Sequence, residues 1–423
     1  MVIDMREMKD SKIDYIGVIP DDWHVKRLKY VLKERNYRSK TGEEMLLSVS
    51  QYRGVVPSDT IQRTMQANSL IGYKKVYLSD LVFNKLNPVL ARFGVSTYEG
   101  ITSPDFAIYY TTEADSRFLC YLLKTSSYIT EYGRICTGVG DGFSRLYTPM
   151  LYNISVALPS QKQQMIIAEF LDAKCAEIDA LSADIQSEID TLEAYKQSVI
   201  AGAVTKGVEK DVPLKDSGMA WCKRIPVHWE VIPSKYLFAN SDLRRLYGDE
   251  QLTASQRHGI ITQTEYMERE NAKIVFANQG LENWKHVSPN DYIISLRSFQ
   301  GGLELSEVSG CITWHYVVLK AKKPIFHRYY KWLFKSSMYI TALQRTCNFI
   351  RDGQDLRYSN FTQVPLPLPP IAEQKKIADY LDGKCRDIDD IIALKREQLA
   401  VLADYKKSVI YEYVTGKKEV PVI

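Results

Sequence analysis

Apolar residues recur every seven positions in two long stretches of the chain. The first stretch covers residues 160–201 without Pro or Gly, and its repeating positions are Leu171, Ile178, Ile185, Leu192 and Val199. A seven-residue apolar repeat is typical of a helix that packs along another helix. Ser160 and Gln163 have the spacing of a capping box at the start of this helix, and Gly207 suits its end.

The second stretch carries the same stripe with one interruption. It follows Pro369 and Pro370, which are tolerated at the start of a helix, and its repeating positions are Leu381, Ile388, Leu402 and Val409. Lys395 occupies the middle slot, and we interpret this as a locally rotated stripe with the lysine in solvent. Because neither helix has another partner of comparable length, we expect the two to pair as an antiparallel coiled coil.

The two stretches are copies of each other. Residues 159–207 and 369–417 are identical at 19 of 49 positions, at a constant offset of 210. A shorter motif opens each half, with Ile19, Pro20 and Trp23 matched by Ile225, Pro226 and Trp229. The segments between them are similar in length but divergent in sequence. The chain therefore reads as a duplicated two-part unit with a pseudo-twofold repeat.

This pattern divides the chain into four predicted parts. Two globular domains are expected over residues 1–158 and 208–368. One long helix is expected over 159–207, and a second long helix with a C-terminal tail over 369–423. The globular parts contain short runs typical of strands, at 75–78, 81–83, 106–110, 292–294 and 316–319, and helical runs at 117–126 and 329–336. We therefore expect an α+β fold, in which the two long helices separate two domains of mixed strands and helices.

Charge favours a polyanionic partner for the divergent segments. Residues 24–158 carry 17 Lys and Arg against 11 Asp and Glu, and residues 230–368 carry 17 against 13. The first helix is acidic, with 4 against 8 over residues 159–207. Positive charge is thus concentrated in the two divergent blocks, which is a weak indication of nucleic-acid binding.

Motifs for catalysis are absent from the sequence. It contains no phosphate-binding P-loop, no Gly-x-Ser-x-Gly elbow and no paired-histidine metal motif, so we expect no catalytic residues, no metal site and no cofactor in this chain. Seven unpaired cysteines indicate reduced thiols. With no apolar run long enough to span a membrane and a charged start, we expect a cytoplasmic protein that does not bind membranes.

The repeats together resemble the specificity subunits of type I restriction–modification enzymes. The resemblance covers essentially the whole chain. It rests on the Ile-Pro-x-x-Trp openings at residues 19–23 and 225–229, on Leu-Pro at 158–159 and 368–369, and on the Phe/Tyr-Leu-Asp-x-Lys copies at 170–174 and 380–384. The alternation of divergent blocks and similar helices is more specific than any of these short motifs.

The resemblance implies a subunit that recognises DNA and has no activity of its own. Two target-recognition domains would each read one half of a split sequence in double-stranded DNA. The helices would set the distance between the halves and dock two modification (methyltransferase) subunits. S-adenosylmethionine would bind those subunits, while ATP and Mg²⁺ would be used by restriction and translocase subunits in the full complex.

Arginine is the side chain best suited to reading base edges in the major groove. We therefore select as candidate DNA-binding residues the arginines of the two divergent blocks, which are Arg92, Arg134, Arg145, Arg297, Arg345, Arg351 and Arg357.

Two other interpretations remain open at this stage. A coiled-coil scaffold that binds only proteins would not need the positive charge of the divergent blocks. A free-standing DNA-binding regulator would explain that charge, but it would not need two long paired helices.

Overall fold

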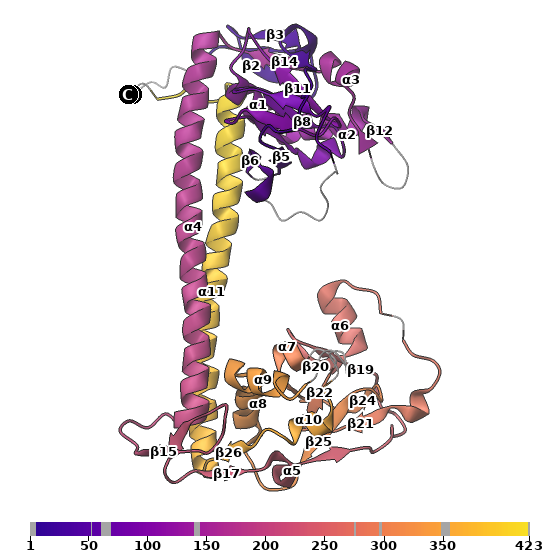
Figure 1. Cartoon of the computed structure of the whole chain (residues 1–423), viewed down its shortest axis with the longest axis vertical. Helices are drawn as coiled ribbons and strands as arrows, with labels where there is room; N and C mark the ends of the chain where they lie inside the picture. The colour runs from indigo at the N-terminus through magenta and orange to yellow at the C-terminus, as the bar shows by residue number, and fades with distance from the viewer. Residues whose placement is uncertain are drawn as a thin grey trace. The chain divides into compact units, whose positions relative to one another are not determined.

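The computed structural model describes residues 6–51, 53–60, 69–138, 144–274, 276–295, 298–347 and 356–421. The chain divides into two compact units. Unit 1 comprises residues 1–185 and 397–423, and unit 2 comprises residues 186–396. Both units draw on the two long helices, α4 (Gln161–Lys206) and α11 (Ile371–Val414), shown in magenta and yellow in Figure 1.

A four-stranded antiparallel sheet forms the centre of unit 1. Its strands follow the order β4 (Lys33–Arg35), β11 (Phe106–Tyr110), β8 (Leu81–Asn84) and β9 (Phe93–Val95). Ile108 of the central strand lies opposite Arg35 on one side and Val82 on the other. Helices α1 (Ser116–Leu123) and α2 (Ser126–Ile135) follow, and Phe118 of α1 is fully buried in the core with Phe83 and Phe93.

Unit 2 repeats this arrangement. Its central sheet has the order β18 (Phe238–Ser241), β25 (Val317–Ala321), β22 (Tyr292–Ile294) and β23 (Glu304–Leu305). Helices α8 (His327–Lys335) and α9 (Ser337–Gln344) take the places of α1 and α2. The duplication visible in the sequence is therefore also a duplication of the fold, and the predicted α+β class with an internal repeat is confirmed.

Shorter elements complete each unit. Those of unit 1 are β1 (Met8–Asp10), β2 (Val18–Pro20), β3 (His24–Arg27), β5 (Leu47–Ser50), β6 (Gly54–Pro57), β7 (Lys74–Val76), β10 (Gly100–Thr102), β12 (Thr137–Gly138), β13 (Ser144–Arg145), α3 (Thr148–Asn153) and β14 (Ser155–Leu158). Those of unit 2 are β15 (Leu214–Asp216), β16 (Arg224–Pro226), β17 (Glu230–Ile232), α5 (Ser234–Leu237), β19 (Leu252–Ser255), β20 (Gly259–Thr262), α6 (Gln263–Glu270), β21 (Lys285–Val287), α7 (Ser298–Gly301), β24 (Gly310–Ile312), α10 (Tyr358–Phe361) and β26 (Leu366–Leu368).

The ends of the first long helix follow the sequence signals. The backbone NH of Gln163 donates to Ser160 Oγ (3.3 Å), and the NH of Ser160 donates to Gln163 Oε1 (3.1 Å), which confirms the capping box. Gly207 ends α4 in the left-handed conformation, with φ +79°. The second helix begins at Ile371, directly after the two prolines that were predicted to start it. The carbonyl of Pro370 accepts the first helical hydrogen bond, from the NH of Gln374 (2.9 Å).

The Ile-Pro-x-x-Trp motifs place a tryptophan against the end of a long helix. Trp23 and Trp229 are fully buried, and each packs edge-on against an aromatic ring, of Phe118 and Tyr329 respectively. A Cβ added to Gly416, which follows α11, would lie 2.4 Å from Pro20 Cγ and 3.0 Å from the Trp23 ring. Only glycine leaves room for this contact. In unit 2, a Cβ added to Gly207, which follows α4, would lie 3.6 Å from the Trp229 ring, so each tryptophan lies beside the glycine that follows a long helix.

Within each unit the two long helices run antiparallel. In unit 2, Glu188 of α4 forms an ion pair with Lys395 of α11, and Lys196 of α4 forms one with Asp389 of α11. Residue numbers therefore rise along α4 as they fall along α11. In unit 1, Lys406 Nζ lies 2.6 Å from Asp179 Oδ1, and the Phe170 and Tyr413 rings are 4.5 Å apart.

All nine predicted stripe positions are shielded from solvent. Leu171, Ile178, Ile185, Leu381, Ile388 and Val409 are buried, and Leu192, Val199 and Leu402 are partly buried. The expectation of a solvated Lys395 is wrong. Its side chain is only 24% exposed and forms an ion pair with Glu188, while Ile392 enters the stripe beside it.

Candidate functional site

Three of the candidate arginines are described in unit 1, and they lie on separate elements. Arg92 is exposed in the turn before β9. Arg134 of α2 is 72% exposed and bonds through two nitrogens to Glu131 (2.7 and 2.8 Å), a pairing that raises the pKa of the arginine. Arg145 of β13 donates to Asp105 Oδ1 (3.1 Å) and lies over the Tyr147 ring.

Two of the four candidates of unit 2 lie among the described residues. Arg345 is exposed at the end of α9, and Arg357 is exposed at the start of α10, where its backbone NH donates to Asn360 Oδ1 (3.0 Å). Arg297 and Arg351 lie outside the described residues. The candidate arginines therefore occupy scattered elements, and their role in DNA binding stays a prediction.

A duplicated carboxylate fastens each globular part to its own segment of long helix. In unit 1, Asp172 of α4 accepts from Arg117 Nη1 (2.8 Å) and from the Tyr121 hydroxyl (2.9 Å), both on α1. In unit 2, Asp382 of α11 accepts from Trp332 Nε1 (2.7 Å) and pairs with Arg328, both on α8. Charged hydrogen bonds of this kind fix direction as well as distance.

A buried glutamine forms the second anchor in each unit. Gln164 Oε1 accepts from the NH of Asp115 (3.0 Å), and its Nε2 donates to the carbonyl of Pro159 (3.0 Å). Gln374 makes the same two bonds in unit 2, to the NH of Phe326 (2.8 Å) and the carbonyl of Pro369 (2.8 Å). The amide satisfies backbone groups that would otherwise be buried without partners, which is costly to disrupt.

Sequence reasoning missed these anchors although the signal was present. Asp172, Asp382, Gln164 and Gln374 are among the identical positions of the two helix copies, and they do not belong to the apolar stripe. A polar residue that is retained in both copies of a diverged duplication marks a contact that both copies need.

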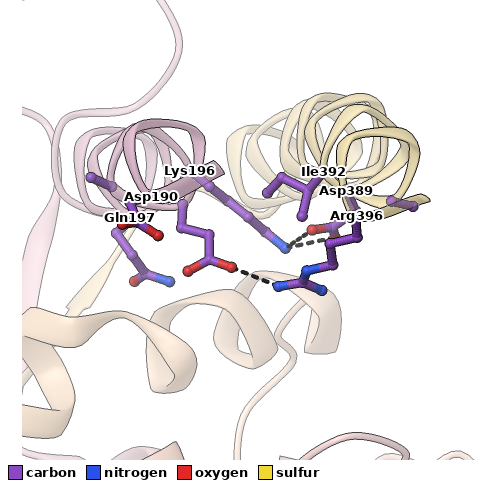
Figure 2. A pocket seen from close by; sticks show the side chains of 9 residues that line it. Asp190, Lys196, Gln197, Asp389, Ile392 and Arg396 are labelled. Carbon is purple, nitrogen blue, oxygen red and sulfur yellow. Dashed lines mark hydrogen bonds and ion pairs between the residues drawn. The ribbon is translucent and has the colours of Figure 1, made fainter. Parts of the chain in front are cut away.

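A salt bridge also crosses the helix pair at matching places. Lys196 Nζ lies 2.6 and 2.7 Å from the two oxygens of Asp389, and the matching residues of unit 1 are Lys406 and Asp179. In unit 2, Arg396 also donates to Glu193 (2.8 Å). The side chains of these two ion pairs line an open groove of about 700 Å³ (Figure 2).

Each central sheet is braced by a buried aspartate in a tight turn. Asp80 precedes β8, accepts from the NH of Tyr77 (2.9 Å) and pairs with Arg35 (3.1 Å). Burial raises the pKa of Asp80 despite these partners. Asp291 precedes β22 in unit 2 and pairs with Lys320 (2.9 Å). Both aspartates stabilise the sheet and are not exposed to a ligand.

The described residues offer no metal centre and no membrane span. Over these residues, no group of three His, Cys, Asp or Glu side chains is placed to hold a metal ion. No helix among them is long and apolar enough to cross a bilayer. No disulfide joins any of the cysteines among these residues.

Solved structures share this duplicated architecture. A chain of a type I restriction–modification system aligns with a TM-score of 0.67 at 15% identity, covering 95% of this chain and 99% of that one. The HsdS subunit of Thermoanaerobacter tengcongensis aligns with a TM-score of 0.50 at 16% identity, covering 95% and 98%. These likenesses define the fold class as two α+β units on paired long helices.

Sequence comparison shows similarity to type I restriction enzyme specificity subunits. Residues 246–403 match the family model described as the type I restriction modification DNA specificity domain. The chain is 22% identical to the putative type I restriction enzyme MjaX specificity subunit of Methanocaldococcus jannaschii, over 99% of both proteins. It is 30% identical to the type I restriction enzyme EcoKI specificity subunit of Escherichia coli over 24% of this chain and 21% of that subunit. The chain is therefore similar to type I specificity subunits along its whole length, and residues 246–403 match their DNA specificity domain.

The carboxylate anchor predicts a defined loss of stability. Replacing Asp172 with Ala removes the acceptor for Arg117 and Tyr121, and we expect unit 1 to lose about 1 kcal/mol, a low value because the ion pair is partly exposed. Thermal unfolding measures the loss. Asp190→Ala is the matched control, since this exposed carboxylate of α4 accepts from Gln186 of the same helix. Equal stability of the two variants would contradict the anchoring role.

Proposed function

We propose that this chain is the DNA-recognition subunit of a type I restriction–modification complex. The observation that carries the proposal is the pattern of retention, since the long helices and their anchors are alike in the two halves while the globular parts differ in sequence. Two DNA-recognition domains that select different sequences must differ from each other, while the helices that carry them must keep the same contacts. Linking two readers also raises avidity without new contacts.

The proposal assigns a role to each predicted part of the chain. The domains over residues 1–158 and 208–368 each read one half of a bipartite target in double-stranded DNA. The helices over 159–207 and 369–423 fix the spacing of the halves. Lys and Arg contacts with phosphates supply most of the affinity, and base-edge contacts supply sequence choice.

Partner subunits would supply the chemistry. Two modification subunits docked on the helices would transfer the methyl group of S-adenosylmethionine, and restriction or translocase subunits would use ATP and Mg²⁺. The chain itself would bind none of these cofactors. The complex would act in the cytoplasm, because its DNA target would lie there and the cysteines of this chain would stay reduced there.

Exchange of one globular block tests the modular reading of DNA. Residues 24–158 are replaced by the matching block of a relative, and the chain is expressed with its modification subunits. We expect one half of the methylated sequence to change and the other to remain, because each block contacts its own half-site. Sequencing of methylated bases gives the result. A change in both halves, or in neither, would exclude independent reading.

Lengthening the helices tests their role in spacing. Insertion of seven residues into both α4 and α11 preserves the apolar stripe and adds about 10.5 Å at 1.5 Å per residue. The unspecified gap in the methylated sequence should then grow by about three base pairs, since DNA rises roughly 3.4 Å per pair. An active complex that keeps the original gap would show that the helices do not set it.

A further inference from the structure

An exposed loop of unit 2 combines aromatic, aliphatic and cationic side chains. It connects β18 to β19, and every residue from 242 to 248 is exposed. Tyr247 is fully exposed (108%), and Leu243 and Leu246 are close to half exposed. Three large apolar groups together in solvent, beside Arg244 and Arg245, suit a surface that is covered by a partner.

The base of this loop is held rigidly from below. Asp249 and His286 are buried, and Asp249 Oδ2 lies 2.9 Å from His286 Nδ1. The same oxygen accepts from the NH of Leu246 (2.8 Å), and the NH of His286 donates to the carbonyl of Leu243 (2.8 Å). Because its backbone is already ordered, the loop would lose little conformational entropy when it binds.

Further contacts hold the arginine backbone to β21. The NH of Arg245 donates to the carbonyl of Trp284 (2.9 Å), and Arg244 forms a β-bridge with Lys285. The guanidinium of Arg245 makes a long bond to the carbonyl of Asp249 (3.3 Å) and also interacts with the Cys311 thiol. A phosphate would be a stronger partner for Arg245 than either group, because it carries a negative charge.

Unit 1 has a loop at the same topological position with a different sequence. It connects β4 to β5, and Arg38 bridges Lys74 as Arg244 bridges Lys285. Gly42 and Gly248 both have positive φ, of +73° and +85°. This loop exposes Tyr37, Arg38 and Lys40. The frame of the loop is thus retained between the units while its exposed side chains differ.

We propose that the β18–β19 loop contacts DNA, with the Tyr247 ring packing against base edges in a groove and Arg245 binding an adjacent phosphate, and that the β4–β5 loop does the same through Tyr37 for the other half-site. This proposal rests on the proposed function. Apolar contacts with base edges and cationic contacts with phosphates are both used by proteins that bind duplex DNA. Divergent tips on a retained frame suit two half-sites of different sequence.

The test uses the chain in complex with its modification subunits and three DNA duplexes. One carries the full methylated target, and each of the others has one half-site scrambled, with half-sites assigned to blocks by the block exchange. Tyr247→Ala should weaken binding to the full target on the order of tenfold, since a base-edge contact contributes about 1–3 kcal/mol. It should cause the same loss when the half-site of the first block is scrambled, and no further loss when its own half-site is scrambled.

Tyr37→Ala is the matched control and should show the reverse pattern. Tyr247→Phe keeps the ring and should bind as the original chain does, whereas Tyr247→Leu should bind as weakly as the alanine variant. Light scattering checks that each complex keeps all its subunits, and thermal unfolding checks that each variant is folded.

Several results would overturn the loop assignment. Unchanged affinity for Tyr247→Ala, or an equal loss on all three duplexes, would show that the ring reads no base. Loss of modification subunits from a variant whose remaining complex binds DNA normally would assign the loop to a protein contact. If the unaltered complex showed no preference for any half-site, the proposed function itself would fail. A clear preference with an insensitive Tyr247 would remove only the loop assignment.

Discussion

The apolar stripe of the two long helices is the constraint on which the rest of the structure depends. Helices of 46 and 44 residues that each present an apolar stripe need a partner along that stripe, and each provides it for the other. The ion pairs beside the stripe, such as Lys196 with Asp389, add direction more than stability because their carboxylates are exposed to solvent. Asp172 and Gln164 fasten the globular part of unit 1 to this pair, and Asp382 and Gln374 do so in unit 2.

The sequence predicted the helices and their pairing well, because a seven-residue repeat and a duplicated segment are both long signals. The five predicted strands lie within about two residues of β7, β8, β11, β22 and β25, whereas the other strands of the described residues were not predicted. The sequence could not predict the ion pair of Lys395, because only the register of the two folded helices brings Glu188 beside it. It also could not distinguish the candidate arginines, since solvated, paired and DNA-contacting arginines look alike in a sequence. Arg134, for example, is paired with Glu131 one turn earlier in its own helix.

Duplication explains why structural and recognition residues can be separated in one chain. Asp172 and Asp382, Gln164 and Gln374, and Asp80 and Asp291 hold matching places and make similar bonds. Because these residues make the same contacts in both units, the same geometry constrains both copies. Exposed loop tips meet no such constraint and can differ, as required of two domains that select different sequences.

The central claim is that this chain selects a split DNA sequence through two separate readers. Mapping of methylated bases in cells that carry the chain and its modification subunits, beside cells that carry the modification subunits alone, tests this claim most directly. The account predicts two specified half-sites of different sequence, separated by a fixed number of unspecified bases, and seen only when the chain is present. A single uninterrupted target, or the same methylation without the chain, would contradict it.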